Sequence, residues 1–492
     1  MLVKPGDIFD RDREWAALAR FATDDSPGAS LAVVSGRRRQ GKTFLLDALT
    51  SEARGFYFAA TEATSDESLR LLGEALAQHL GLPASLRLDT WEAAIDALLG
   101  LGRDRPVPVV LDEFPYLVRS SPELPSVVQK ALGPRRAART ASRARLVLCG
   151  SAMTFMGKLL SGSAPLRGRA SLELVVPTLD FRQAARFWEI DDPRLAALLH
   201  AVVGGTPAYK TEYARGDRPT SIDDFDDWVV RTVLDATSPL FREARYLLAE
   251  EPGLREPSLY HSVLAAVAEG NTTRGGIANY VGRSSSDLAH PLNVLEDAGL
   301  LVRESDAFRP ARPRFRIAEP LMAFYHAVMR PSWSLLGRPG RARDVWRSSR
   351  ARFSTQVVGP HFERMCREWT ATAAAPDTMG ALPHLVTWGL VPDPGGRTHH
   401  EVDVVAFGDE MGRKVLALGE AKWGHAMTAR DLDRLVHVRE LVAARPGLDT
   451  TDARLLLFSG AGFHADLHSA ARDGDVVLVD LDRLYAGGTD HV

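Results

Sequence analysis

A glycine-rich loop between a strand and a helix is the feature that most constrains this chain. Residues 36–43 read Gly-Arg-Arg-Arg-Gln-Gly-Lys-Thr, which fits the pattern G-x-x-x-x-G-K-[ST]. A β-rich run over 31–35 precedes the loop, and a helical pattern over 42–50 follows it. The glycines let the backbone curl until its N–H groups and the helix N-terminus point at phosphate oxygens. The sequence therefore predicts a phosphate site made by Gly36, Arg37, Arg38, Arg39, Gln40, Gly41, Lys42 and Thr43.

Strands and helices alternate along the chain after this loop. Further short apolar runs lie at 55–58, 107–111, 146–148 and 172–176, with helical patterns between them. Such alternation predicts a parallel sheet wrapped by helices, and hence an α/β fold.

The loop and two later strand ends supply the side chains that phosphate chemistry needs. Lys42 is expected to reach the β- and γ-phosphates, and Thr43 to hold Mg²⁺. The strand at 107–111 ends in Asp112, expected to hold the water shell of Mg²⁺, and Glu113, expected to polarise the attacking water. Ser151 ends the next strand. It either touches the γ-phosphate or the attacking water, or caps the helix that follows.

The pattern changes twice after residue 180. Residues 180–252 are helical throughout and include four aspartates, at 223, 224, 226 and 227, which is typical of a solvated face. Residues 257–330 predict three helices and two short strands, an order that resembles a winged helix-turn-helix. Residues 331–352 carry six arginines against one acidic residue, which indicates a basic connector. Strands and helices then alternate again over 402–479.

The charge of the segment 257–330 leaves two roles open. Eight arginines stand against seven acidic residues, and the third helix is itself acidic, which disfavours phosphate contact. The wing favours such contact, because four arginines cluster there: Arg309, Arg312, Arg314 and Arg316. DNA is the expected partner, and a structural or protein-binding winged helix is the alternative.

A second set of acidic residues lies on two strands near the C-terminus. Asp403 is on one strand, while Glu420 and Lys422 share a face of the next. Asp403 and Glu420 would bind one or two divalent metal ions, and Lys422 would stabilise the charge that develops on a phosphodiester. This pattern resembles the PD-(D/E)xK nuclease core, where an upstream helix often adds a carboxylate, here Glu363. Adjacent histidines at 399 and 400 are either auxiliary acid–base groups or surface residues.

These motifs together are similar to those of the archaeal-type P-loop ATPases, AAA-related proteins that are also found in bacteria. The residues that carry the resemblance are 9–14, 36–43, 111–114, 149–151, 164–169 and 203–207. The resemblance implies that the phosphate site binds ATP, and it places Phe9 and Arg11 beside the adenine by analogy. It also makes Arg169 a candidate sensor of the γ-phosphate, in cis or from a neighbouring subunit, with a plain surface arginine as the alternative.

The resemblance also implies a domain order. It predicts an ATPase core over 1–178, a helical lid over 179–256, a winged helix-turn-helix over 257–330, a basic connector over 331–352 and a restriction-endonuclease-like α/β domain over 353–492. Proteins of this type often assemble into dimers or rings, so we expect a homo-oligomer whose size the sequence leaves open.

Composition limits the class of protein and the cellular compartment that we expect. The formal net charge of -3 excludes a uniformly basic nucleic-acid coat. Two cysteines, Cys149 and Cys366, are too few for a disulfide framework and fit a reducing cytoplasm. No apolar run approaches the roughly 20 residues of a membrane span, so we expect a soluble, cytoplasmic protein. Seven of the 60 basic residues are lysine, and two of these are Lys42 and Lys422, where a compact ammonium is favoured.

The sequence therefore favours a multidomain protein that binds and hydrolyses ATP and acts on DNA through a winged helix and a Mg²⁺-dependent nuclease-like domain. The alternative is a nucleotide-gated signalling or transcriptional switch in which the nuclease fold is inactive.

Overall fold

The computed structural model describes residues 2–249, 256–472, 474 and 476–486. These residues form two compact units. Among the described residues, the first contains 2–178 together with 206–208, and the second contains 179–205, 209–249 and those from 256 onward. None of the described helices is long and apolar enough to cross a membrane.

A five-stranded sheet in the order β2-β3-β4-β1-β5 is the centre of the first unit, and all its strand pairs are parallel. Its strands are β1 (Ser30–Ser35), β2 (Phe56–Ala59), β3 (Val107–Asp112), β4 (Ala144–Gly150) and β5 (Ala170–Val175). The predicted α/β fold with a parallel sheet is thus confirmed. Alternate side chains of each strand point to opposite faces, so Leu31 and Val33 enter one core and Ala32 and Val34 another.

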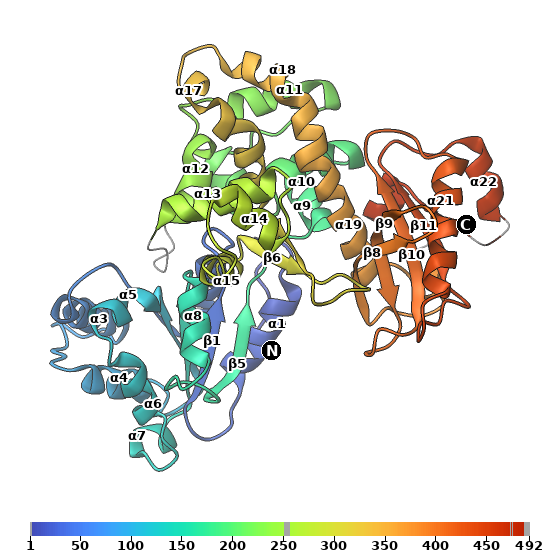
Figure 1. The fold of residues 1–492 in the computed structure, drawn as a ribbon. Helices are drawn as coiled ribbons and strands as arrows, with labels where there is room; N and C mark the ends of the chain where they lie inside the picture. The colour runs from blue at the N-terminus through green and yellow to red at the C-terminus, as the bar shows by residue number, and fades with distance from the viewer. Residues whose placement is uncertain (1, 250–255, 473, 475, 487–492) are drawn as a thin grey trace. The chain divides into compact units, whose positions relative to one another are not determined.

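Helices cover both faces of this sheet (Figure 1). Helices α1 (Asp12–Thr23) and α2 (Lys42–Ala53) pack in the core of Ala32 and Val34. The opposite core holds α3 (Ser65–His79), α4 (Trp91–Gly100), α5 (Phe114–Ser120), α6 (Leu124–Ala131) and α8 (Met153–Leu160), with the short α7 (Ala137–Thr140) beside it. Because the strands are parallel, the carboxyl ends of β1, β3 and β4 meet at one edge of the sheet.

The helical part of the second unit is one packed body. Its first helices are α9 (Phe181–Trp188), α10 (Pro193–Val203), α11 (Ile222–Trp228) and α12 (Pro239–Ala249), with the π-helical turns η1 (Tyr209–Tyr213) and η2 (Val229–Val233) between them. They share an apolar core with α13 (Pro257–Ala268), α14 (Arg274–Val281) and α15 (Ala289–Asp297). Strands β6 (Leu301–Glu304) and β7 (Arg314–Ile317) follow as an antiparallel pair.

The arginine-rich segment 331–352 is helical and packed. It contains α17 (Trp333–Leu336) and α18 (Ala342–Arg352), and it follows α16 (Pro320–Phe324), η3 (Tyr325–Met329) and η4 (Arg330–Ser332). Two arginines of α18 pair with the aspartates of α11: Arg343 with Asp227 at 2.8 Å and Arg350 with Asp226 at 2.7 Å. The acidic cluster and the basic segment, which the sequence treats as separate surface features, therefore face each other.

The C-terminal part of the second unit is a mixed sheet in the order β12-β11-β10-β9-β8. Its strands are β8 (Leu385–Asp393), β9 (Thr398–Phe407), β10 (Val415–Lys422), β11 (Arg454–Ser459) and β12 (Val476–Val479). β8, β9 and β10 are antiparallel neighbours, while β10, β11 and β12 are parallel. Figure 1 shows α19 (Gly359–Thr372) and α21 (Ala429–Ala443) on opposite sides of this sheet. The remaining elements are η5 (Phe353–Val358), α20 (Pro376–Met379), α22 (Ala465–Arg472) and α23 (Leu481–Ala486).

Strand β8 has no counterpart among the predicted elements. Gly389 and Pro392 interrupt its apolar pattern, and both residues are typical of turns. β8 tolerates proline because it is the edge strand of the sheet. Gly389 is required because a Cβ there would lie 2.6 Å from the Phe308 ring.

Candidate functional site

The loop 36–43 lies between the end of β1 and the start of α2, at the edge where the carboxyl ends of the strands meet. Gly36 has no room for a side chain, because a Cβ there would lie 2.6 Å from the Val176 carbonyl oxygen. Gly41 has a φ of 86°, a left-handed conformation that glycine adopts without strain, and it precedes the first residue of α2. Both glycines therefore serve the loop geometry that the motif predicts.

Lys42 is buried inside this loop. The residue is only 5% exposed, and its Nζ donates to the Arg37 carbonyl oxygen at 2.8 Å. Burial lowers the pKa of Lys42, although the nearby carboxyl groups of Glu113 and Asp112 act in the opposite direction. A buried ammonium held by a loop carbonyl is well placed to exchange that carbonyl for an anionic oxygen of a ligand.

Thr43 and Asp112 point at each other from α2 and the end of β3. The Thr43 hydroxyl donates to Asp112 Oδ2 at 2.8 Å, and the Tyr57 hydroxyl of β2 donates to the same oxygen at 2.6 Å. Burial would raise the pKa of Asp112, but hydrogen bonds from Cys149, Tyr57 and Thr43 lower it overall. The carboxyl group is thus held ionised, as a metal-binding role requires. Tyr57 was not predicted, because nothing near it in sequence marks it as part of the site.

Glu113 and Ser151 form a second pair at the same edge. The Ser151 hydroxyl lies 2.9 Å from Glu113 Oε1 and 3.0 Å from Oε2. Helix α8 begins at Met153 with Ala152 at its N-cap, so the expectation that Ser151 caps this helix is wrong. Glu113 has a φ of 50°, a conformation that non-glycine residues rarely adopt and that often marks functional sites.

The remaining loop residues have different surroundings. Arg38 donates to the Tyr116 hydroxyl at 3.0 Å. The Oε1 atom of the buried Gln40 is an acceptor with no hydrogen-bond partner among the described residues. Arg11 supports the loop from outside: its guanidinium donates to the Pro177 carbonyl at 2.7 Å and to the Gln40 carbonyl at 3.4 Å. Arg11 therefore supports the loop by hydrogen bonds to backbone carbonyl groups of the loop and of Pro177.

Arg169 lies at the other end of the sheet. It precedes β5, whose first residue, Ala170, pairs with Leu31, whereas Ser35 beside the loop pairs with Val175. Six strand steps of about 3.3 Å separate Arg169 from the loop, so the distance along the strand is roughly 20 Å. This placement argues against a role in cis. A role from a neighbouring subunit and a plain surface position are the interpretations that are left.

The second predicted site is on the C-terminal sheet. Asp403 lies where β9 carries an extra residue opposite Thr387 and Gly389, a β-bulge of the kind that re-aims side chains. Its carboxylate accepts the Ala421 N–H of β10 at 2.8 Å. Burial, with the carboxylates of Glu363 and Glu420 nearby, raises the pKa of Asp403 well above its usual range. The structure therefore brings Asp403 next to the Glu420 strand, as the sequence predicts.

Glu420 is buried and paired with two cations. Lys422 Nζ lies 2.6 Å from Glu420 Oε1, and Arg434 of α21 contacts the same oxygen. Burial lowers the pKa of Lys422, but the Glu420 carboxylate outweighs this effect and the net shift is upward. Arg434 was not predicted, because it comes from a helix that only the fold brings to the strand.

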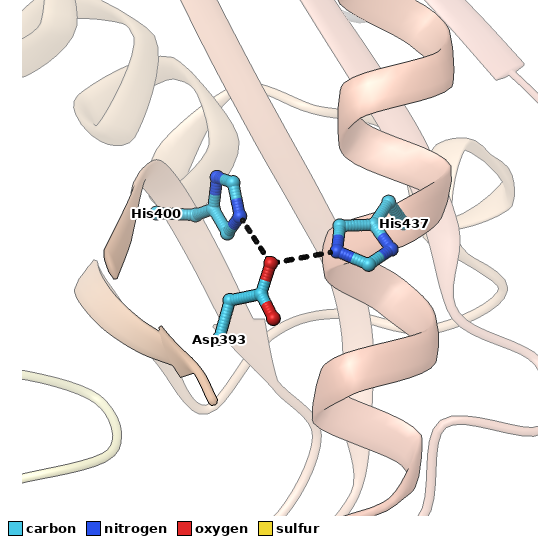
Figure 2. A group of neighbouring side chains, drawn as sticks. All are labelled: Asp393, His400 and His437. Carbon is cyan, nitrogen blue, oxygen red and sulfur yellow. Dashed lines mark hydrogen bonds and ion pairs between the residues drawn. The ribbon is translucent and has the colours of Figure 1, made fainter. Parts of the chain in front are cut away.

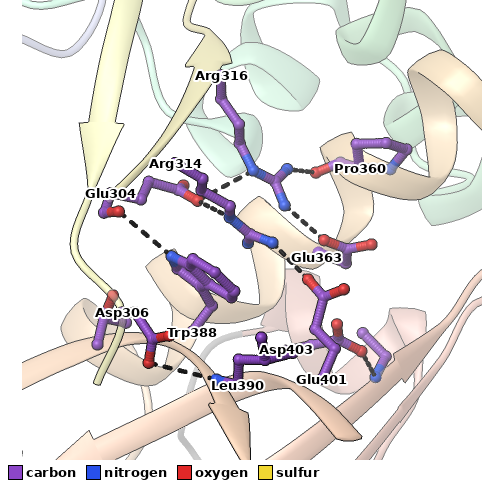
Figure 3. Close-up of polar contacts among 12 residues, drawn as sticks. Glu304, Asp306, Arg314, Arg316, Pro360, Glu363, Trp388, Leu390, Glu401 and Asp403 are labelled. Carbon is purple, nitrogen blue, oxygen red and sulfur yellow. Dashed lines mark hydrogen bonds and ion pairs between the residues drawn. The ribbon is translucent and has the colours of Figure 1, made fainter. Parts of the chain in front are cut away.

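The remaining carboxylates of this region are tied to the β6–β7 pair (Figure 3). Arg316 pairs with Glu363 of α19, and Arg314 pairs with Glu401 of β9. Both arginines also contact Glu304, at 2.8 Å from Arg314 and 3.0 Å from Arg316. Burial alone would raise the pKa of Glu304, but Arg367, Arg316 and Arg314 hold it at about 2. Arg314 and Arg316 are thus engaged inside the protein, and the expectation that they contact DNA phosphates is wrong for this arrangement.

The donor sets of the two sites suit different groups. At the loop 36–43, N–H groups and Lys42 suit phosphate, and the oxygens of Thr43 and Asp112 suit Mg²⁺. Beside the C-terminal sheet, carboxylate oxygens of Glu363, Glu401 and Asp403 lie within 4.8 Å of one another, an all-oxygen set that suits Mg²⁺ or Mn²⁺. Glu420, which the sequence predicts as a ligand, is not in this group. A further group joins Asp393, His400 and His437. Of these, the sequence marks His400 alone.

The parallel sheet with the loop 36–43 at the carboxyl ends of its strands is an α/β unit that carries a candidate phosphate site. No family model matches the chain. The chain is 25% identical over 480 residues to the uncharacterised protein MJECL04 of Methanocaldococcus jannaschii, a match that covers 96% of this chain and 99% of that protein. The similarity thus extends over both units.

Solved structures with similarity to the chain include three archaeal proteins. The Walker-type ATPase PABY2304 of Pyrococcus abyssi is 22% identical with a TM-score of 0.49, over 66% of this chain and 97% of that one. The ORC2 protein of Aeropyrum pernix, in ADPNP–ADP complexes, is 16% identical with a TM-score of 0.43, over 71% and 97%. Cdc6p from Pyrobaculum aerophilum is 15% identical with a TM-score of 0.33, over 70% and 96%.

Proposed function

We propose that the chain binds and hydrolyses ATP at the edge of the first sheet. The observation that carries this proposal is the convergence of buried Lys42, the Thr43–Asp112 pair and the Ser151–Glu113 pair on one loop. Lys42 and the loop N–H groups bind the β- and γ-phosphates, and Thr43 and Asp112 would hold Mg²⁺, which would neutralise phosphate charge. Glu113 then accepts the proton of the attacking water, and Ser151 fixes the direction of its carboxylate.

The test compares ATP binding and phosphate release in the full chain and two lysine variants. Lys42→Ala is expected to lose ATP binding and turnover, since no other ammonium lies in the loop sequence. Lys158→Ala, at an exposed lysine of the same unit, is the matched control and is expected to behave as the wild type. Equal binding by wild type and Lys42→Ala would refute the assignment.

For the second unit we infer a metal-dependent centre that cuts a nucleic-acid phosphodiester. In its C-terminal part, helix α19 with Glu363 precedes the strands of Asp403 and Glu420, and helix α21 follows them, which agrees with the upstream carboxylate and the following helix that the sequence predicts. Asp403 at its bulge and Glu420 on the next strand would supply metal ligands, and Lys422 would stabilise the charge of the transition state.

The nuclease assay uses plasmid and linear DNA with Mg²⁺ or Mn²⁺, in the presence and absence of ATP. Wild type is expected to cut, and Lys422→Ala to lose cutting while it keeps ATP turnover. Lys414→Ala, an exposed lysine of the same part of the chain, is the control. If wild type cuts neither DNA while it hydrolyses ATP, the switch with an inactive nuclease fold is the better description.

A further inference from the structure

Three side chains from separate elements meet on the C-terminal sheet, on the side that α21 covers (Figure 2). Asp393 ends β8, His400 lies on β9 opposite Val391, and His437 lies on α21. In the part of the chain that the structure describes, this is one of two groups whose ligand atoms lie within 4.8 Å of one another, and it is the one that contains histidine.

The Nε2 atoms of both imidazoles point at the same oxygen of Asp393. His400 Nε2 lies 3.3 Å from Asp393 Oδ2, and His437 Nε2 lies 3.2 Å from that oxygen. Ligands of a tetrahedral zinc ion with bonds of 2.0–2.1 Å are themselves separated by about 3.3 Å. The spacing therefore matches two edges of a metal coordination polyhedron, while it is long for charge-assisted hydrogen bonds.

One backbone hydrogen bond orients Asp393, and a further carboxylate lies near His437. The Gly396 N–H donates to the other oxygen of Asp393 at 2.9 Å, which fixes the direction of the carboxylate. Glu440, one turn along α21, lies 4.0 Å from His437 Nδ1. Carboxylates in this outer position are a regular feature of metal-binding histidines. Val391, Val402 and Val438, which are close in sequence to the three residues, are buried in an apolar core, whereas 47% of the His437 side chain is exposed.

We propose that Asp393, His400 and His437 bind one divalent transition-metal ion of the zinc class. Two imidazoles and one carboxylate favour Zn²⁺, Co²⁺ or Ni²⁺ over Mg²⁺, which prefers oxygen ligands. The exposed side leaves room for water or a further ligand. The site is distinct from the carboxylates of Glu363, Glu401 and Asp403, and it stands whether or not the chain cuts DNA.

The position of the ion gives it a structural consequence. His437 lies three residues after Arg434 on α21, and Arg434 contacts Glu420 and donates to the Glu401 carbonyl at 2.8 Å. An ion that joins α21 to β8 and β9 would therefore fix the helix that positions Arg434. Zinc binding is expected to raise the melting temperature of the second unit.

The experiment titrates Zn²⁺ and Mg²⁺ into the full chain after chelation, by calorimetry, and follows bound Co²⁺ by its visible absorption. Wild type is expected to bind one more Zn²⁺ than His400→Asn or His437→Asn, with no such difference for Mg²⁺. His399→Asn is the matched control, because this exposed histidine is next to His400 on the same strand and outside the cluster. Glu440→Gln, which leaves all three ligands in place, is expected to weaken Zn²⁺ binding about tenfold.

Circular dichroism of the metal-free proteins checks that the variants fold. If the ligand variants do not fold, the Co²⁺ spectrum and the Glu440→Gln affinity decide the matter. Equal Zn²⁺ stoichiometry and affinity in wild type and His437→Asn, or a Co²⁺ spectrum without the intensity of a tetrahedral site, would overturn the proposal. The three side chains would then be a hydrogen-bonded cluster that holds no metal.

Discussion

At the scale of single residues, His326 shows what burial does to a titratable group. It lies in η3, is almost fully buried, and neither of its ring nitrogens has a hydrogen-bond partner among the described residues. Burial, with the charge of Arg330 adding to it, lowers the pKa of His326 to about 3. The imidazole of His326 is therefore neutral in the folded protein.

This pKa predicts acid sensitivity. In the unfolded chain the pKa of this histidine is about 6.5, so below that pH the unfolded chain binds a proton that the folded chain does not bind. The free energy of unfolding is therefore highest above pH 6.5 and declines as pH falls toward 3. At pH 5 the loss amounts to about 2 kcal/mol. His326→Phe is expected to reduce the dependence of unfolding free energy on pH between 7 and 5, measured by urea unfolding. Part of the dependence should stay, because burial also lowers the pKa of His200 and His361. His290→Phe, at an exposed histidine, should leave the slope unchanged.

Ser151 supports a second prediction at this scale. Its hydroxyl contacts both oxygens of Glu113, so Ser151→Ala should lower kcat for ATP hydrolysis and leave ATP affinity nearly unchanged. Glu113→Gln should lower kcat further, by about 10²–10⁴, the usual contribution of a general base. Steady-state kinetics with separate binding measurements distinguishes the two effects, and Ser126→Ala, on an exposed serine, is the control. A Ser151→Ala variant with the kcat of the wild type would show that the contact between Ser151 and Glu113 does not contribute to catalysis.

At the scale of elements, the arginines of strand β7 and those of the loop between β6 and β7 have different surroundings. Arg314 and Arg316 are held by Glu304, Glu401 and Glu363, whereas Arg312 is exposed and Arg309 is partly exposed. Removing one partner from a buried ion pair is costly, because the other charge stays buried. The first two arginines therefore belong to the packing of the unit, and the second two are available to a ligand.

A pair of double variants tests this division. Arg309→Ala with Arg312→Ala should weaken DNA binding and reduce the slope of log K against log salt by about 2, with little change in stability. Arg314→Ala with Arg316→Ala should instead destabilise the second unit by about 3–5 kcal/mol. Fluorescence anisotropy at several salt concentrations and urea unfolding separate the outcomes. An unchanged salt slope in the first variant would favour a winged helix that serves structure or protein contacts.

At the scale of the whole molecule, the two units have separate apolar cores among the described residues. Units with separate cores are expected to unfold as separate cooperative transitions. A ligand stabilises the unit that binds it by about 2.7 kcal/mol at a hundred times its Kd.

Calorimetry of the full chain is therefore expected to show two transitions. Mg²⁺ and ATP should raise one of them by several degrees and leave the other in place, and Lys42→Ala should abolish this shift. Zn²⁺ should raise the other transition in the wild type and not in His437→Asn. A single transition that both ligands raise together would show that the units unfold as one.

The same scale explains which parts of the fold and of the sites were predictable. The strands of the first unit, the loop 36–43 and the Asp112–Glu113 pair follow from local patterns, because glycine spacing and apolar runs act over a few residues. Strand β8 was missed, since Gly389 and Pro392 make sense only at a sheet edge packed against Phe308. The ion pairs of Arg343 and Arg350 were missed as well, because their partners are more than a hundred residues away in sequence.

The sequence by itself determined what short motifs encode: the glycine-rich loop with Lys42 and Thr43, the acidic end of β3, and the position of Glu420 and Lys422 on one strand face. The tertiary structure decided everything that depends on which distant segments meet. It brought the Tyr57 hydroxyl into a hydrogen bond with Asp112, and it paired Arg434 with Glu420 and Arg316 with Glu363. It also brought Asp393, His400 and His437 together. The physical reason is that hydrogen bonds and ion pairs act over a few ångströms in space, and sequence separation does not reveal that distance.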